Sequence, residues 1–150
     1  MKTCFLFGHR NSPYDLQEDI IRAVNFQHTE FGVEHFVVGS YGNFDRMAAR
    51  AVILVRKEYP QITLSLLLPY HPAERPIETP LGFDNTYYPL GGEKVPRRFA
   101  IVYANQHMIK HADSVICYAK YIGNARLLYE LAHKRKERDG IYVQNLAETN

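Results

Sequence analysis

Short apolar runs alternate along the chain with segments in which apolar residues recur every three or four positions. Strongly apolar runs, such as Leu64 to Leu68, are typical of strands buried on both faces of a parallel sheet. The spacing of three and four is typical of amphipathic helices that cover such a sheet. We therefore expect strands over residues 3–8, 35–39, 62–68, 113–119 and 141–144, and helices over 15–30, from Phe44 to just before Pro60, over 97–111 and over 124–138.

This order of elements predicts an α/β fold with a mostly parallel, five-stranded sheet. Right-handed crossovers place helices on both faces, which gives a three-layer α/β/α sandwich. The simplest strand order is 3-2-1-4-5. The length of 150 residues fits one domain over 1–150.

Local signals mark the ends of two helices. Asp15 to Glu18 has the pattern of a capping box, so we expect the first helix to begin there. Gly140 suits the residue after the last helix, where a left-handed conformation is common. The basic residues from Lys134 to Lys136, with Arg138, complement the dipole at that helix end, which favours a structural role over a nucleic-acid surface.

The segment from residue 69 to residue 96 breaks the alternation. Prolines are spread through it at Pro69, Pro72, Pro76, Pro80, Pro89 and Pro96. Its aromatic residues argue against disorder, because they are costly to leave in water: Tyr70, Phe83, Tyr87 and Tyr88. We expect this long loop to form a flap over a site at the ends of the strands. An ordered loop that only covers the core and an oligomer contact are the alternatives.

Composition narrows the possible classes of protein. Apolar residues make up 46% and charged residues 23%, and no run is long enough to cross a bilayer, so no membrane association is expected. The formal net charge of +2 is too small to indicate a nucleic-acid surface. Cys4 and Cys117 lie in strand-like runs, which favours buried thiols over a disulfide. Without a secretory signal at the N-terminus, we expect a cytoplasmic protein.

Glycine-containing turns follow three of the expected strands. A short strand-to-helix turn exposes backbone N–H groups at the positive end of a helix dipole, where anions bind. Ligands of open α/β sheets bind at the carboxyl ends of the strands, where the strand order reverses. The expected ligand-binding residues in these turns are Gly8, His9, Arg10 and Asn11 after the first strand, Gly39, Ser40, Tyr41, Gly42, Asn43 and Asp45 after the second, and Tyr121, Gly123, Asn124 and Arg126 after the fourth.

Each of these residues also has a simpler structural explanation. Gly39 and Gly42 could merely permit a tight turn, and Asn43 could cap the second helix. Asp45 could be stabilised by the helix dipole, and Arg10 could be an ordinary solvated residue. Three such turns at one sheet edge favour a phosphate-bearing, nucleotide-like ligand, with Arg10 as its bidentate partner.

Common catalytic and cofactor motifs are absent from the sequence. Neither G-x-G-x-x-G nor G-x-x-x-x-G-K-[ST] occurs, and Ser40 has no G-x-S-x-G pattern around it. His107 and His111 are four residues apart on an expected helix, but no third ligand is evident. We therefore expect no cofactor and no metal site.

The order of these motifs resembles the SLOG superfamily of Rossmann-like domains. The resemblance spans nearly the whole chain and is carried by Gly8-His9-Arg10, by Gly39 to Asp45, by Leu68-Pro69-Tyr70 and by Gly123 to Arg126 with Glu130. The superfamily includes YpsA-type proteins, the LOG ("lysine decarboxylase-like") phosphoribohydrolases and the DNA-processing protein DprA. It implies a Rossmann-like fold, binding or sensing of a nucleotide-derived ligand, a contribution of Tyr70 to the site, and a homo-oligomer.

The enzymatic branch of the superfamily has the pattern P-G-G-x-G-T-x-x-E, whose glutamate takes part in cleaving an N-glycosidic bond. The resemblance places Glu130 on that glutamate and Gly123 on the first glycine. Asn124 and Arg126 replace the other glycines, and Leu127 replaces the threonine. The pattern therefore favours a binding protein over an enzyme.

Three functions follow, in order of preference. The first is binding or sensing of a nucleotide or a nucleotide-derived ligand. The second is hydrolysis of a nucleoside monophosphate, with Glu130 and either Arg10 or Arg126 as the working pair. The third is DprA-like binding of single-stranded nucleic acid through Lys94, Arg97, Arg98 and the aromatic residues of the long loop.

Overall fold

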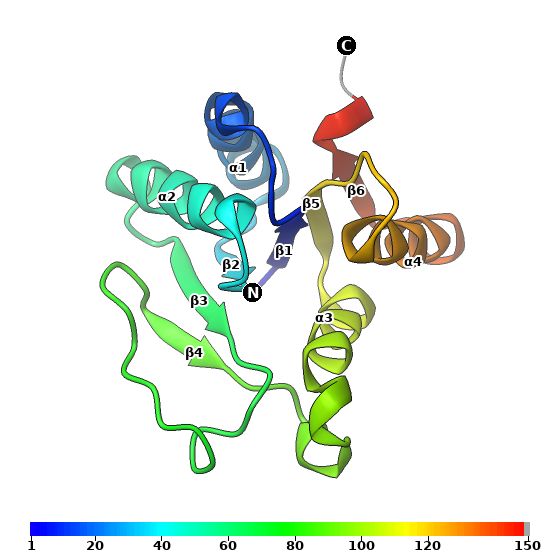
Figure 1. Cartoon of the computed structure of the whole chain (residues 1–150). Coiled ribbons are helices and arrows are strands. Elements are labelled where there is room, and N and C mark those ends of the chain that lie inside the picture. Colours follow the sequence, from blue (N-terminus) through cyan, green and yellow to red (C-terminus); the bar gives the residue numbers. More distant parts are fainter. Residues whose placement is uncertain (149–150) are drawn as a thin grey trace.

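The computed structural model describes residues 1–148, in which helices flank a six-stranded sheet (Figure 1). The strands lie in the order β4-β3-β2-β1-β5-β6, and every neighbouring pair is parallel. The strands are β1 (Thr3–Gly8), β2 (His35–Val38), β3 (Thr63–Leu67), β4 (Asn85–Tyr87), β5 (Ser114–Tyr118) and β6 (Tyr142–Asn145). The α-helices are α1 (Gln17–Phe31), α2 (Asn43–Glu58), α3 (Ala100–His111) and α4 (Asn124–Asp139).

This architecture confirms the expected Rossmann-like α/β class, but the expected number of five strands is wrong. The sixth strand, β4, forms at the sheet edge inside the segment 69–96. Its start is held by Asp84, whose carboxylate accepts the Leu64 N–H at 2.8 Å and pairs with Arg56 at 2.7 Å. A strand of three residues in a proline-rich segment is too short to show a periodic pattern. The hydrogen bond and the ion pair of Asp84 also cannot be predicted from the pattern of apolar and polar residues.

Two helix starts also differ from expectation. A 3₁₀ turn over Tyr14–Leu16 precedes α1, whose N-cap is Leu16, and no side chain caps it. The expected capping box beginning at Asp15 is therefore not formed. A second 3₁₀ turn, Arg97–Phe99, follows Pro96 and delays the start of α3 until Ala100. At the C-terminal end of α4, Gly140 caps the helix in the left-handed conformation, as expected.

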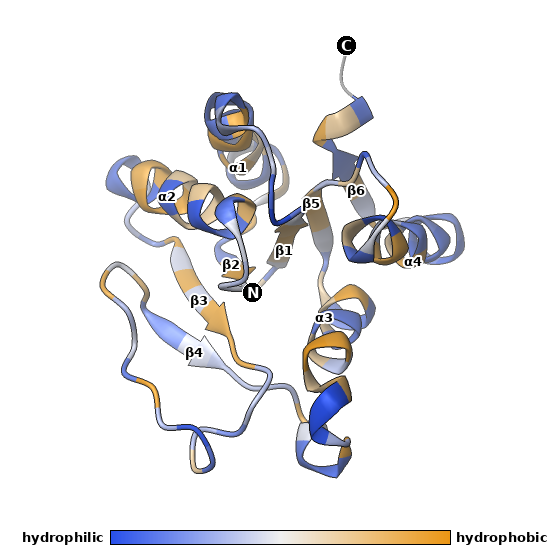
Figure 2. Cartoon of the chain, in the orientation of Figure 1, coloured by the Kyte–Doolittle hydropathy of each residue, from blue (hydrophilic) through white to orange (hydrophobic). Residues whose placement is uncertain are grey.

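The sheet separates two apolar layers (Figure 2). Helices α1 and α2 cover one face and α3 and α4 cover the other (Figure 1). Alternate residues of β1 serve the two layers, because successive side chains of a strand point to opposite faces: Cys4 and Leu6 pack under α1 and α2, whereas Phe5 and Phe7 pack under α3 and α4. All four side chains are buried.

The strand order reverses at β1, between β2 and β5. The chain moves outward from β1 through β2 and β3 to β4, then returns through α3 to place β5 on the other side of β1. The His9 N–H donates to the Tyr118 carbonyl at 3.3 Å and continues the β1–β5 pairing past the strand end. Connections that leave β1 and β5 in opposite directions open a crevice at this point, which is where ligands of such sheets bind.

Within residues 1–148, no helix is both long enough and apolar enough to cross a membrane. Cys4 and Cys117 are free and buried, as expected. Burial raises the pKa of the Cys4 thiol to about 12 and raises that of Cys117 as well.

Candidate functional site

The turn after β2 lies directly against the chain leaving β1. A Cβ atom on Gly42 would lie 2.5 Å from the Arg10 Cα atom, so this contact between two backbones requires glycine. The Asn43 N–H donates to the Arg10 carbonyl at 3.0 Å. The Asn43 side chain accepts the Ser12 N–H at 2.8 Å and donates to the Ser12 carbonyl at 2.6 Å. Asn43 therefore fastens the loop after β1 to α2, while Gly42 is the N-cap of the helix.

His9 connects the ends of β1 and β5. Its Nε2 atom accepts the N–H groups of Lys120 at 2.9 Å and Tyr121 at 3.0 Å. An acceptor nitrogen carries no proton, and burial lowers the pKa of His9, so the imidazole is neutral. Its ring also packs edge-on against Tyr118, with the ring centroids 5.8 Å apart. His9 thus positions the loop that leads into α4.

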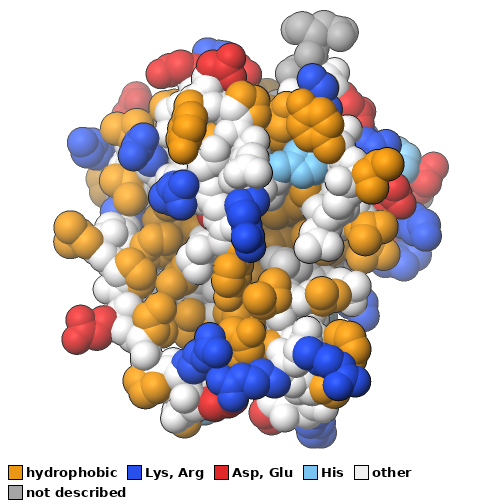
Figure 3. Space-filling model, viewed as in Figure 1, with side chains coloured by type: hydrophobic (Ala, Val, Ile, Leu, Met, Phe, Trp, Pro, Cys, Tyr) orange, Lys and Arg blue, Asp and Glu red, His pale blue; other side chains and the backbone are white. Residues whose placement is uncertain are grey.

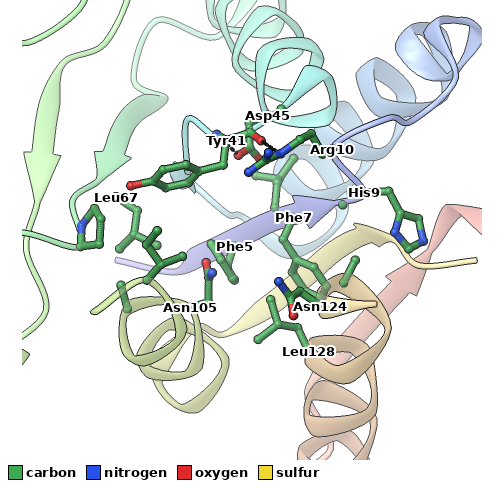
Figure 4. Close-up of a pocket in the computed structure, with 18 residues that line it drawn as sticks. Phe5, Phe7, His9, Arg10, Tyr41, Asp45, Leu67, Asn105, Asn124 and Leu128 are labelled. Atoms are coloured by element: carbon green, nitrogen blue, oxygen red, sulfur yellow. Dashed lines mark hydrogen bonds between the residues drawn. The ribbon is translucent and has the colours of Figure 1, made fainter. Parts of the chain in front are cut away.

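A cavity of about 340 Å³ opens between these turns and helices α3 and α4 (Figure 4). Its floor is apolar and is formed by β1 and β3, whereas its rim carries arginine, carboxylate and amide groups. The lining residues are Phe5, Leu6, Phe7, Gly8, His9, Arg10, Gly39, Tyr41, Gly42, Asp45, Leu67, Pro69, Ile101, Ala104, Asn105, Asn124, Ala125 and Leu128. A space of this size, apolar below and polar at the rim, is typical of small-molecule sites.

Arg10 and Asp45 face the cavity from the same side and fix Tyr41 between them (Figure 4). Arg10 Nε donates to the Tyr41 carbonyl at 3.0 Å, and the Asp45 carboxylate accepts the Tyr41 N–H at 2.9 Å. Desolvation raises the pKa of Asp45 to about 6, although the Tyr41 N–H and Arg46 oppose the shift. The cavity therefore places a cation beside a carboxyl group that titrates near neutral pH.

Polar amides lie on the opposite wall. Asn105 projects from α3 and Asn124 from the first turn of α4 (Figure 4). Neither side-chain amide has a hydrogen-bond partner within residues 1–148. Asn43, at the equivalent position of α2, uses both of its amide atoms on Ser12. The two free amides are therefore available to a ligand.

The structure brings most of the expected residues to this sheet edge. Those that line the cavity are Gly8, His9, Arg10, Gly39, Tyr41, Gly42, Asp45 and Asn124. Three others, Asn11, Ser40 and Asn43, line an open groove of about 470 Å³ that shares Arg10, Tyr41 and Gly42 with the cavity. Tyr70 lines a third hollow of about 210 Å³, together with Ser40 and Tyr41.

The remaining expected residues lie outside all three spaces. Gly123 is the N-cap of α4, and its φ of 152° favours glycine. Tyr121 is exposed and lies over His9, with ring centroids 5.4 Å apart. Arg126 contacts the Ala119 carbonyl at 3.4 Å and pairs with Glu130 at 3.9 Å along the surface of α4. The geometry gives no support to Glu130 as a catalytic acid.

Sequence reasoning missed the floor and the far wall of the cavity. Phe5, Phe7 and Leu67 have the pattern of ordinary core residues of strands, so hydropathy alone could not separate them from the rest of the core. Asn105 left only a weak signal, because it is followed by the polar residues Gln106 and His107 and so does not stand out from the polar part of α3. Its position on the inner side of the helix becomes clear only once the packing of α3 is known.

Within the described part of the chain, no group of three or more His, Cys, Asp or Glu residues is arranged to hold a metal ion. His107 and His111 stack with ring centroids 4.3 Å apart, and His107 shares a 2.9 Å hydrogen bond with the Tyr87 hydroxyl. This pair lies on α3, outside the residues that line the cavity.

Taken together, the cavity can hold a flat or apolar ring on its floor and polar groups at its rim. Arginine offers a bidentate contact to an anion, and the carboxylate and amides can bind hydroxyl groups or ring edges. The sequence matches no protein-family model, and a search of curated proteins finds no match.

Proposed function

We propose that the chain binds a nucleotide or a nucleotide-derived ligand in the cavity at the carboxyl ends of β1 and β2. The observation that carries this proposal is the position of Arg10, at the rim of a cavity whose floor is formed by Phe5, Phe7 and Leu67. An aromatic base would lie on the apolar floor, and its phosphate would lie against the guanidinium group. The resemblance to the SLOG superfamily points to the same class of ligand.

The charges suggest how such a ligand is oriented. Asp45 is the sole carboxylate among the lining residues and lies in the first turn of α2. When ionised it would repel a phosphate at that helix start and would accept the hydroxyl groups of a ribose instead. The start of α4 carries no acidic residue in its first turn, and its N-cap, Gly123, has no side chain. We propose that the phosphate lies against Arg10 and away from the Asp45 carboxylate.

The long loop contributes to one end of this site. Pro69, two residues after the end of β3, lines the cavity, and Tyr70, Arg75, Pro76 and Ile77 line the adjoining hollow. We propose that the part from residue 69 to residue 77, and not the whole segment 69–96, covers one end of the ligand. Figure 3 shows apolar side chains inside the hollow of this face and lysine and arginine side chains around it.

A thermal-shift screen tests the proposal. The four common nucleoside 5′-monophosphates, ADP-ribose and cyclic dinucleotides would each be added at about 1 mM. A ligand at about 100 times its Kd stabilises the native state by about 2.7 kcal/mol. For a chain of this length we expect a rise in Tm of about 5–10 °C. Absence of a shift with every compound would contradict the proposal.

Paired variants make the screen specific. Arg10→Ala removes the cation at the cavity rim and should reduce the shift by about half or more, because a tenfold loss of affinity lowers the stabilisation by about 1.3 kcal/mol. Arg50→Ala removes an exposed arginine of α2 that lines none of the three spaces, and it should leave the shift unchanged. Equal losses in both variants would show that binding reflects general surface charge.

We further propose a cytoplasmic location and a homo-oligomeric state. The two buried, free thiols fit a reducing compartment. Apolar side chains exposed near the cavity, Val102 on α3 and Leu127 on α4, offer a surface for a second copy. Light scattering after size-exclusion chromatography tests the oligomer, and a monomeric mass would contradict it.

A further inference from the structure

A second hollow of about 210 Å³ adjoins the cavity on the side of the long loop. The two spaces share Tyr41, Leu67 and Pro69. The Tyr41 backbone is held on both sides, because its carbonyl accepts from Arg10 and its N–H donates to Asp45. Tyr41 lines both compartments, and the second compartment is also lined by Tyr70 and Arg75.

Two arginines share the ring of Tyr70 at this second compartment. The guanidinium carbon of Arg75 lies 4.2 Å from the ring centroid, and that of Arg97 lies 5.5 Å from it. Arg97 pairs with Glu74 at 2.6 Å. Arg75 has no carboxylate partner within residues 1–148. Two cations held beside one carboxylate leave a net positive charge at the compartment.

Stacking of arginine on an aromatic ring orients the cation without using its hydrogen-bond donors. The flat face of the guanidinium group contacts the ring, and the N–H groups at its edge remain free to bind an anion. Phosphate is the anion that fits this planar fork best, because two of its oxygens accept in parallel. Arg75 lies over the Tyr70 ring and brings its N–H donors to the compartment that Tyr41 also lines.

We propose that this second compartment binds a second phosphate of a ligand whose nucleoside lies in the main cavity. The inference rests on the proposed function and narrows it to nucleotides that carry a further phosphate beyond the first, as in nucleoside diphosphate sugars and dinucleotides. The two phosphates of such a ligand share a bridging oxygen, so they lie next to each other at the boundary between the two spaces beside Tyr41, the first held by Arg10 and the second by Arg75.

Calorimetry with matched ligand pairs tests the second compartment. AMP is compared with ADP-ribose, and GMP with GDP-mannose, because each pair shares a nucleotide and differs in the second phosphate and its sugar. Arg75→Gln should weaken the diphosphate ligand by about fivefold, the size expected of a partly exposed charged contact, and should leave the monophosphate unchanged. Equal effects on both members of a pair would overturn the proposal.

Arg98→Gln is the matched control for this experiment. Arg98 is an exposed arginine of the same segment that stacks on Phe99 at 4.8 Å and does not line the compartment. Arg98→Gln removes the same charge as Arg75→Gln, and it should change neither the affinity for the monophosphate nor that for the diphosphate ligand. A loss of diphosphate binding as large as that of Arg75→Gln would assign the effect to overall charge and contradict a site at Arg75.

A second measurement separates this inference from the proposed function. The chain contains no tryptophan, so Tyr70→Trp introduces a single fluorescent reporter that keeps a ring for the two arginines. Pyrophosphate should change its emission saturably, and Arg75→Gln in the same background should abolish the change. A response to pyrophosphate without binding of any nucleotide would refute the proposed function alone. Nucleotide binding without a pyrophosphate response would refute the second compartment alone.

Discussion

Replacing Asp45 by asparagine should stabilise the protein at neutral pH. The Asp45 carboxyl group lies at the cavity in a desolvated position, and its pKa is raised from 3.8 to about 6. A group whose pKa is higher in the native state than in the unfolded chain favours folding while it is protonated. Its contribution is therefore greatest at low pH and is lost as the pH rises from about 4 to about 6.

The size of the effect follows from the shift. One pKa unit corresponds to about 1.4 kcal/mol, so the whole shift corresponds to about 3 kcal/mol, and about 2 kcal/mol of this falls between pH 4 and pH 7. Asparagine is uncharged at all of these pH values, and its side-chain oxygen can still accept the N–H of Tyr41. The free energy of unfolding of Asp45→Asn, relative to the native sequence, should therefore rise by about 2 kcal/mol over this range.

Urea denaturation at half-unit steps from pH 4 to pH 7 measures this difference. Asp139→Asn is a control with the opposite sign, because the hydrogen bond from Arg138 lowers the pKa of Asp139. That variant should lose stability relative to the native sequence only as the pH rises toward about 4, so its difference from the native sequence should stay nearly constant from pH 4 to pH 7. If the difference in the free energy of unfolding between Asp45→Asn and the native sequence does not change with pH, folding does not raise the pKa of Asp45.

A gain in stability of Asp45→Asn at neutral pH would indicate that Asp45 has a role other than stabilising the fold. A residue that destabilises the native state at working pH, yet faces a cavity, is typical of a site selected for binding or chemistry. If Asp45 binds ribose hydroxyl groups as an ionised carboxylate, the stabilised variant should also bind nucleotide more weakly at pH 7.

Three further predictions concern the framework of the site. Gly42→Ala should lower the free energy of unfolding by about 1–3 kcal/mol, since its Cβ atom would lie 2.5 Å from the Arg10 Cα atom. Urea denaturation measures this change, with Ser40→Ala at an exposed position as a neutral control. Equal stabilities of the two variants would contradict the close contact. His9→Leu should lower the free energy of unfolding by about 1–3 kcal/mol, because two backbone N–H groups lose their acceptor. Hydrogen exchange should become faster at the Lys120 and Tyr121 amides. Unchanged protection at these amides would count against the role of His9. Cys4 is fully buried with its pKa raised to about 12, so its thiol should react with Ellman's reagent only after unfolding; rapid labelling of the native protein would contradict this packing.

The sheet was largely predictable from the sequence because its strands are buried on both faces. Runs such as Val115 to Tyr118 are apolar without interruption. Each lies between two segments with helical periodicity and is too short for a helix, so a strand is the element that fits. The right-handed crossover rule then leaves few strand orders, and the observed order agrees once β4 is added at the edge. β4 escaped prediction because it is held by Asp84, through a carboxylate contact to the neighbouring strand that depends on tertiary structure.

The candidate site was predictable in place but only partly in detail. Gly8, Arg10 and Gly42 reach the cavity because strand ends of a parallel sheet share one edge. The hydrogen bonds of His9 and Asn43 connect loops that are distant in the sequence, so their structural roles could not be inferred from local pattern.

Calorimetry at pH 7 is the sharpest test of whether a nucleotide binds beside Arg10. The best ligand of the thermal-shift screen would be titrated into the native protein, Arg10→Ala and Arg50→Ala. We expect saturable binding of one ligand per chain, a loss of at least about tenfold in affinity for Arg10→Ala, as for a charged hydrogen bond in a cavity, and no change for Arg50→Ala. Absence of binding, or the same affinity in all three proteins, would contradict nucleotide binding at Arg10.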